Sequence, residues 1–501
     1  MRITNNIELA GECKNMCNQD KTPLLDAITK FIETKPAYFR IPGHRLERGI
    51  SSKWTDKVGK EIFAYDVTET PFTDDLHSPE SSILEAEELL QELYQSDKSF
   101  FLVNGTTCGN EAMLFSAALE GQEVMIARNA HKSAMMGLII SGAKPVYVMP
   151  EVLEEWGLQG GIRPEIVRRT FEEHPKCKAL FLVSPSYYGI SSDLKALADI
   201  CHEYGAMLLV DEAHGGHMYF HEALPLGALE QGADMCVQSM HKVTGALTQS
   251  SVLHIKSSIA DCERVASNLH IVQSTSPNYL LMTSLDCARY ELAMHGEEMM
   301  KQALELAEYA REHINTVSGF RCMTAEVIEK AEIAGLDRTR LVISAKKLGL
   351  TGFALEELLF KDYAVNMELA DYENVLAIVT YANTKEEIER LIEACKSISG
   401  KYTVKIESEC VQLSFPQLPE QVLTPRQAYF SEVEEISWQQ AVGKISAEMI
   451  APYPPGIPII YPGERITQEV WDYLERFRRE KRHIHGSRDG KLEVIKVIKS
   501  E

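Results

Sequence analysis

The stretch AMLLVDEAHGG, residues 206–216, decides the fold class. Its apolar run at 207–210 has the length of a buried strand and stops at the acidic residue Asp211. A run that is apolar on both faces is typical of a parallel strand covered by helices on both sides. Ligands of such sheets bind at the carboxyl ends of the strands, where Asp211 would lie. The stretch therefore predicts an α/β fold with a site at this edge of the sheet.

The same alternation of apolar runs and amphipathic helices continues on both sides. Helices are expected at 82–95, 112–119 and 193–204, the last capped by Asp193 and closed by Gly205. Further strands are expected at 100–103, 124–127, 145–149, 179–183, 235–238 and 252–255. This order predicts a mostly parallel sheet with helices on both faces.

The 501 residues are enough for several domains. We expect an N-terminal arm at 1–20, a large α/β domain at 21–300, a small α+β domain at 301–410 and a C-terminal domain at 411–501. Long helices at 278–294 and 297–318 lead into the small domain, for which the pattern predicts strands at 340–344 and 375–380 and helices at 353–361 and 385–395. The Pro-rich segment 451–463 is incompatible with a regular helix or a central strand.

Composition excludes several classes of function. The 51 Lys and Arg residues against 73 Asp and Glu residues give a net charge of −22, which excludes a nucleic-acid binder or a ligand of anionic membranes. No apolar run approaches the roughly 20 residues of a membrane span, and the polar start has no signal-peptide pattern, so a cytoplasmic location is expected. The 11 cysteines lack a zinc-type spacing, which predicts reduced thiols and no metal site.

The motif NGTTCGN, residues 104–110, lies between a predicted strand and a predicted helix. Its glycines let a backbone approach a ligand closely. The hydroxyls of Thr106 and Thr107, next to Cys108, can hold a phosphate at a helix start. The motif matches neither a Walker loop nor the dinucleotide-binding pattern. Because similar turns occur without a ligand, this motif alone could be either a phosphate-binding turn or an ordinary turn between a strand and a helix.

Two further motifs follow predicted strands. Asp211 could equally be a helix cap or part of a solvated turn. In SMHK, residues 239–242, Lys242 is either an ordinary surface charge or a Schiff-base lysine kept reactive by a partly desolvated site. Each residue alone favours the simpler interpretation.

Together the three motifs meet the needs of pyridoxal phosphate. This cofactor requires an anion cradle, a carboxylate that keeps its pyridine nitrogen protonated, and a lysine for its aldehyde. Asp211 and Lys242 are separated by 242 − 211 = 31 residues, which leaves room for a β-α-β stretch between neighbouring elements of one site. A ring that stacks on the pyridine is also expected, and His131 in RNAHKS, residues 128–133, is the candidate.

An ordered series of motifs links these residues to a known family. It comprises PGH at 42–44, DVTE at 66–69, DLH at 75–77, the motifs at 104–110 and 128–133, SPSYYG at 184–189, those at 211–214 and 239–242, PYPPG at 452–456 and PGE at 462–464. Over residues 21–480 or so the chain resembles the ornithine/lysine/arginine decarboxylases, pyridoxal-phosphate enzymes with the aspartate-aminotransferase-like fold (fold type I). It resembles the short branch of that family, to which bacterial arginine decarboxylases belong.

The resemblance implies a role for each matching residue. Lys242 would bind the cofactor, Asp211 would pair with its ring nitrogen, and His131 would stack on the ring opposite Ala213 or His214. Thr106, Thr107, Ser239 and His241 would hold the phosphate, and Thr275 would reach it from a partner subunit, since two subunits of this fold share each site. Met240 stands where the family commonly has Thr, so one hydroxyl contact is absent. Lys242 or His241 would protonate the substrate Cα.

The resemblance implies decarboxylation of a small basic amino acid by a homodimer or higher homo-oligomer. Arginine, giving agmatine for polyamine synthesis, is the first choice; lysine (giving cadaverine) and ornithine (giving putrescine) are the alternatives. Glu464 would recognise the cationic tail of the substrate, although a surface salt bridge explains it almost as well. An aminotransferase or a carbon–carbon lyase on the same fold is the alternative from another class. A non-catalytic paralogue is disfavoured because Lys242 and Asp211 are both present.

Overall fold

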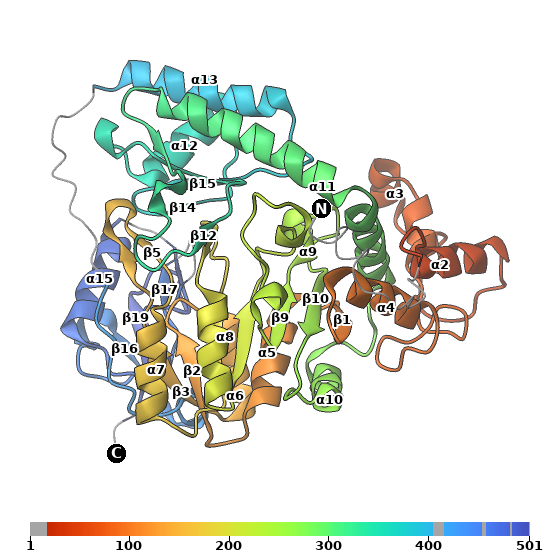
Figure 1. Cartoon of the computed structure of the whole chain (residues 1–501), viewed down its shortest axis with the longest axis horizontal. Coiled ribbons are helices and arrows are strands. Elements are labelled where there is room, and N and C mark those ends of the chain that lie inside the picture. Colours follow the sequence, from red (N-terminus) through yellow and green to blue (C-terminus); the bar gives the residue numbers. More distant parts are fainter. Residues whose placement is uncertain (1–17, 404–414, 453–456, 481–482, 500–501) are drawn as a thin grey trace. The chain divides into compact units, whose positions relative to one another are not determined.

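The structure is a computed structural model and describes residues 18–403, 415–452, 457–480 and 483–499. The chain divides into two compact units (Figure 1), one at 1–116 and 210–299 and the other at 117–209 and 300–501. The predicted arm at 1–20 and the PYPPG motif at 452–456 fall almost entirely outside the described residues. The predicted domain boundaries stay predictions.

The first unit contains most of the predicted site residues. Its strands are β1 (Lys98–Leu102), β9 (Met235–Gln238), β10 (Ser251–Ile255) and the end of β8 (Met207–Asp211). Its helices are α2 (Pro23–Glu33), α3 (Ser52–Val58), α4 (Ser82–Tyr94), α5 (Gly105–Ala117), α9 (Met240–Val243), α10 (Cys262–Val272) and the first part of α11 (Tyr279–Asn315). Helix α4 contacts both α2 and β1, and its apolar face is buried there.

The second unit combines α/β and α+β segments. Its first segment contains β2 (Glu123–Ala127), α6 (Lys132–Ser141), β3 (Lys144–Val148), β4 (Val152–Leu153), β5 (Leu158–Gln159), α7 (Pro164–Glu173), β6 (Ala179–Val183), β7 (Ile190–Ser191) and α8 (Leu194–Glu203). Its second segment contains β11 (Arg321–Cys322), β12 (Gly335–Leu336), β13 (Arg340–Ser344), α12 (Gly352–Tyr363), β14 (Leu369–Ala370), β15 (Val375–Ile378) and α13 (Lys385–Lys401). The C-terminal elements are α14 (Pro425–Phe430), β16 (Val433–Ser437), β17 (Ala451–Pro452), α15 (Gln468–Arg479), β18 (Ile484–His485) and β19 (Val494–Ile498).

The largest sheet has the strand order β1-β10-β9-β8-β6-β2-β3. Strand β2 runs parallel to β3 and to β6, whereas β10 is antiparallel to β1 and to β9, with Phe100 opposite Leu253. All seven strands coincide with the predicted ones to within two residues at either end. The predicted fold class, a mostly parallel α/β sheet with smaller C-terminal α+β parts, is confirmed.

The smaller sheet of the second unit has the order β11-β13-β15-β14. Helix α12 contacts α13 and the strands β14 and β15 (Figure 1), and together they bury an apolar core that includes Leu341, Leu355 and Leu391. Complete burial of one such side chain contributes about 1.5–3 kcal/mol to folding. The predicted β-α-β-α order of this region is confirmed.

Three predicted helix boundaries are wrong. Helix α13 continues to Lys401, beyond its predicted end at residue 395. Helix α5 begins at Gly105 rather than near residue 112, so Thr106 and Thr107 lie in its first turn. Helix α11 is one helix of 37 residues, where the sequence predicts a break before residue 297. Gly296 does not end it. A Cβ on Gly296 would lie 2.8 Å from the Phe220 ring, so glycine permits close packing there.

Among the described residues, no helix combines the length and the apolar character needed to cross a membrane.

Glu87 on α4 gives a testable pH dependence. Its side chain is buried, its Oε1 accepts a hydrogen bond from the Phe101 N–H at 2.9 Å, and burial raises its pKa to about 7. The folded chain therefore keeps a proton that the unfolded chain releases above about pH 4.5, so this stability is complete below that pH and is lost as the pH rises through 7. Glu87→Gln keeps the acceptor and removes the titration.

The variant should match the wild type near pH 5 and be more stable at pH 7.5, by up to roughly 3 kcal/mol. Thermal unfolding followed by circular dichroism across this range measures the difference. Glu85→Gln, on the same helix but paired with Lys21 at the surface, is the control and should show no such divergence. A constant offset between Glu87→Gln and the wild type at both pH values would contradict the assignment.

Candidate active site

Asp211 is the last residue of β8 and its carboxylate is held from two sides. The Asn110 Nδ2 of α5 donates to Oδ2 at 2.7 Å, and the Ala213 N–H donates to Oδ1 at 3.1 Å. The side chain of Asp211 is only 3% exposed. A buried carboxylate with both oxygens engaged has a fixed direction, which a group that pairs with a ring nitrogen requires.

Lys242 lies in α9, directly after β9. Its Nζ is 3.0 Å from the Nε2 of His214, a buried residue three positions after Asp211. The ends of the two strands are joined by backbone hydrogen bonds from the Glu212 N–H to the Val237 carbonyl and from the Ser239 N–H to the Ala213 carbonyl, at 3.0 and 3.3 Å. The 31-residue separation in sequence therefore brings the predicted carboxylate and amine to one place.

The predicted phosphate cradle lies at the start of α5. The Thr106 hydroxyl is 3.0 Å from the Ser239 hydroxyl, and Thr107 lies in the same first turn. The free N–H groups at the N-terminus of a helix add positive potential, so this turn and the two hydroxyls fit an anion. Gly105 has a φ of +72°, a conformation that favours glycine at the turn into the helix.

Gly109 and Cys108 have other roles than the motif suggested. A Cβ on Gly109 would lie 2.5 Å from Val237 and 2.8 Å from Leu102, so this glycine lets α5 pack against β9 and β1 and does not serve a ligand's approach. The Cys108 thiol is buried, donates to the Gly105 carbonyl at 3.1 Å, and has a pKa that burial raises to about 12. Cys108 could therefore hold an anion only through its backbone N–H.

His241 is neutral in this arrangement. Its Nδ1 lies 3.0 Å from the Ser250 carbonyl oxygen, which can only accept, so Nδ1 carries the proton. Burial lowers the pKa of His241, and the neighbouring charge of Lys242 lowers it further. In this tautomer the proton is on Nδ1 and Nε2 has a lone pair. The predicted phosphate contact of this imidazole stays a prediction.

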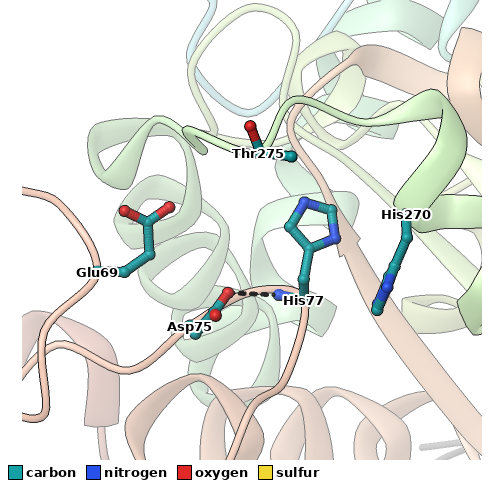
Figure 2. A pocket seen from close by; sticks show the side chains of 5 residues that line it. All are labelled: Glu69, Asp75, His77, His270 and Thr275. Atoms are coloured by element: carbon teal, nitrogen blue, oxygen red, sulfur yellow. Dashed lines mark hydrogen bonds between the residues drawn. The ribbon is translucent and has the colours of Figure 1, made fainter.

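Thr275 lines a different pocket of the first unit, with a cavity of about 360 Å³. Figure 2 shows Thr275 above the side chains of Glu69, Asp75, His77 and His270, which line the same pocket. His77 Nε2 is 2.9 Å from the Ser274 carbonyl oxygen, a contact that gives this histidine a structural role. The predicted contact of Thr275 with a phosphate concerns a second copy of the chain and stays a prediction.

His131 belongs to the second unit, where it caps α6. Its Nδ1 accepts the Ser133 N–H at 3.3 Å and lies 2.9 Å from the Ser133 hydroxyl. These contacts fix the direction of the imidazole ring. Its predicted stacking role stays a prediction.

Glu464, in the same unit, forms a buried ion pair. Its two carboxylate oxygens accept from Arg128 Nη1 at 2.6 Å and Nη2 at 2.8 Å, and its side chain is 0% exposed. The guanidinium also contacts the rings of Tyr147 and Tyr461, with its Cζ 4.9 and 4.3 Å from the ring centroids. Burial raises the pKa of Glu464, and Arg128 opposes that rise. These contacts favour the interpretation of Glu464 as one half of an ion pair over a role in substrate binding. The ion pair is buried, however, and the sequence suggests one at the surface.

Three residues of these clusters had no role in the sequence interpretation. Asn110 and Arg128 stand inside quoted motifs, but nothing in their spacing shows that they would meet Asp211 and Glu464. Glu212 follows Asp211 and is fully buried. A charged residue inside an otherwise apolar strand end was the only signal available for it.

The chain matches two family descriptions, "Orn/Lys/Arg decarboxylase, major domain" over residues 22–387 and "Orn/Lys/Arg decarboxylase, C-terminal domain" over residues 408–489. It belongs to the Orn/Lys/Arg decarboxylase family. It is 36% identical to the arginine decarboxylases of Halalkalibacterium halodurans and Bacillus subtilis, in each case over 97% of this chain and 99% of the relative. The predicted family and the predicted enzyme class, an amino-acid decarboxylase, are confirmed.

Solved structures of this family have the same fold. The constitutive lysine decarboxylase of Escherichia coli superposes with a TM-score of 0.81 at 22% identity, covering 96% of this chain and 82% of that one. A lysine decarboxylase of Francisella novicida gives the same TM-score and identity, covering 95% of this chain and 81% of that one. At this level of identity, the likeness concerns the fold alone.

The Arg128–Glu464 pair gives a prediction for stability. Glu464→Ala leaves a buried guanidinium without its carboxylate, and the free energy of unfolding should fall by about 3–5 kcal/mol. Arg128→Met combined with Glu464→Leu should cost clearly less than the sum of the two single changes, because no charge stays buried alone. Urea unfolding of the wild type, Arg128→Met, Glu464→Leu and the double variant measures the cycle, and the same experiment on Glu464→Ala measures the cost of the unpaired guanidinium.

Glu203→Ala is the control. It breaks the exposed pair of Arg168 and Glu203 in the same unit and should cost less than about 1 kcal/mol. Equal losses for Glu464→Ala and Glu203→Ala, or additive losses in the cycle, would show that the buried pair is not a coupled unit.

Proposed function

We propose that this decarboxylase converts arginine to agmatine and CO2, with pyridoxal phosphate bound at Lys242. The choice of arginine is carried by the 36% identity with two proteins named arginine decarboxylase, over nearly their whole length. The constitutive lysine decarboxylase of Escherichia coli is 24% identical. Lysine and ornithine are therefore the second candidates within the same family.

The side chains around β8 and β9 fit the three polar groups of pyridoxal phosphate. An amine, a fixed carboxylate and a pair of hydroxyls at a helix N-terminus correspond to its aldehyde, its ring nitrogen and its phosphate. When bound, the cofactor supplies an aldehyde that condenses with amines and a ring that accepts the electrons of the broken bond. All of these residues belong to the first unit.

Asp211 would hold a proton on the ring nitrogen. Its carboxylate is the acceptor, and the hydrogen bonds from Asn110 and Ala213 keep it from rotating away. A fixed negative group in a buried site stabilises a neighbouring positive charge more than the same group in water. Loss of this charge would weaken the electron sink on which decarboxylation depends.

Lys242 is the better candidate for protonating the substrate Cα. Its Nζ lies 3.0 Å from His214 Nε2, and an ammonium at that position carries three N–H groups, any of which would supply the proton. The alternative donor, His241, is neutral and directs its only N–H to the Ser250 carbonyl. A neutral imidazole in that tautomer has no proton available on the other side.

Lys242→Ala and Asp211→Asn test the proposed function. Lys242→Ala should lose the covalent adduct that borohydride reduction traps in the wild type, and activity should fall on the order of 10²–10⁴-fold. Asp211→Asn should keep the adduct but lose roughly 10²–10³-fold in kcat. Asp234→Asn is the control, because Asp234 is buried at the opposite end of β9. Mass spectrometry of the reduced protein and CO2 release measure both effects.

The same assay separates the candidate substrates. Arginine, lysine and ornithine are compared by kcat/KM, and the organic product is identified as a diamine, agmatine or a keto acid. A higher kcat/KM for lysine or ornithine would replace arginine. A keto acid without CO2 release would instead support an aminotransferase, and full activity of Lys242→Ala would refute the cofactor assignment.

We also propose a homodimer or higher homo-oligomer of this chain. Support comes from exposed apolar side chains of the first unit between residues 39 and 72, among them Phe39 at 88%, Phe72 at 69% and Trp54 at 55% exposure. Such residues are costly to leave in water, and a second copy would cover them.

Phe72→Glu and Trp54→Glu should shift the chain toward the monomer in sedimentation velocity, because each places a charge in the proposed interface. Phe360→Glu, an exposed aromatic of the second unit, is the control and should leave the oligomer intact. A wild-type chain that sediments as a monomer at micromolar concentration would contradict the proposal.

A further inference from the structure

Glu212 is a fully buried carboxylate next to Asp211, and its oxygens collect three hydrogen bonds. Gln238 Nε2 and the Tyr219 hydroxyl donate to Oε2, each at 2.8 Å, and the Ala228 N–H donates to Oε1 at 2.7 Å. Burial raises its pKa to about 7, and the three donors oppose that rise. A carboxylate kept in such a place needs every one of these donors, because an unsatisfied buried charge is strongly unfavourable.

The hydrogen bonds beyond Gln238 run toward Glu212. His254 Nε2 lies 3.3 Å from Gln238 Oε1, which can only accept, so the proton of His254 is on Nε2. His254 Nδ1 then accepts from the Ser99 hydroxyl at 2.7 Å. Burial lowers the pKa of His254 to about 3, so this ring stays neutral. A chain of donors from β1 across β10 and β9 thus ends on one carboxylate after β8.

Glu212 and its partner Gln238 are close in sequence to Asp211 and Lys242, the two predicted cofactor contacts. Glu212 comes one residue after Asp211, and Gln238 comes one residue before Ser239 and four before Lys242. The bond between them joins the end of β8 to the end of β9 immediately behind the groups that meet the cofactor. Backbone hydrogen bonds from Glu212 to Val237 and from Ser239 to Ala213 also join these ends, and the Glu212–Gln238 bond is a side-chain link between the same two segments.

We propose that Glu212 is a positioning residue that holds Asp211 and Lys242 in mutual register through its hydrogen bond with Gln238. It contacts neither substrate nor cofactor and acts through the two strand ends. The proposal rests on the cofactor assignment made above. A displacement of about 1 Å at such a site lowers function by about 10²-fold, so loss of the bond should be measurable in cofactor binding as well as in turnover.

Glu212→Gln is the first test, because the amide has nearly the same size but presents an N–H group to donors. We expect the dissociation constant of its holoenzyme for pyridoxal phosphate to rise about 10- to 100-fold, measured by the absorbance of the bound cofactor. We also expect kcat to fall while KM for arginine changes little. Glu87→Gln is the matched control. Glu87 is also buried in the first unit with a pKa raised to about 7, but it bonds to Phe101 on β1.

A second pair of variants tests the bond itself. In the double variant Glu212→Gln/Gln238→Glu the carboxylate and amide exchange places, so one can still donate to the other and the new carboxylate can accept from His254. We expect it to recover most of the cofactor affinity. Tyr219→Phe removes one donor with little change of shape and should raise the dissociation constant for pyridoxal phosphate a few-fold. This variant serves as the test if Glu212→Gln is too unstable to purify.

Three results would overturn the proposal. The first is a Glu212→Gln holoenzyme that keeps wild-type affinity for the cofactor. The second is an equal loss of affinity in Glu87→Gln, which would make Glu212 one buried carboxylate among others. The third is a folded exchange variant that binds the cofactor no better than Glu212→Gln. A wild-type protein that binds no pyridoxal phosphate would instead refute the cofactor assignment, so the two failures are distinguishable.

Discussion

The backbone pairing at the ends of β8 and β9 is the interaction on which the candidate site depends. It is made by Glu212 with Val237 and by Ser239 with Ala213. Asp211 and Lys242, from opposite sides of the pairing, are thereby brought into one site, and the turn into α5 adds its helix N-terminus and hydroxyls through Thr106.

Three carboxylates are buried away from water, and each is compensated by a different set of neighbouring groups. Glu464 is compensated by a guanidinium that contacts both of its oxygens, whereas Glu212 is compensated by neutral donors only. Glu87 accepts a hydrogen bond from the backbone N–H of Phe101, and burial raises its pKa to about 7. The first arrangement favours a permanent ion pair, and the other two favour a carboxyl group whose charge depends on pH and on its neighbours.

The strands were predictable because each contains a short apolar run of strand length, and such runs alternate with amphipathic helices along the chain. The cap of α8 was predictable for a similar local reason, since Asp193 accepts from the Ala196 N–H at 3.0 Å. Glycine positions were not. Gly109 looked like part of a ligand-binding turn, and a helix break was expected before residue 297, but Gly109 and Gly296 both permit close packing against side chains from distant parts of the sequence. Local sequence contains no information about which side chain will lie opposite a glycine.

The sequence by itself determined the fold class, the family and the identity of the amine and carboxylate at the candidate site, because these depend on residue type and order along the chain. Only the tertiary structure decided which groups surround them. It placed Asn110 on Asp211, His214 on Lys242 and Gln238 on Glu212, and it buried Glu464 against Arg128. Each of these contacts joins residues at least 26 positions apart, and the partner, the burial and the tautomer all follow from packing in three dimensions.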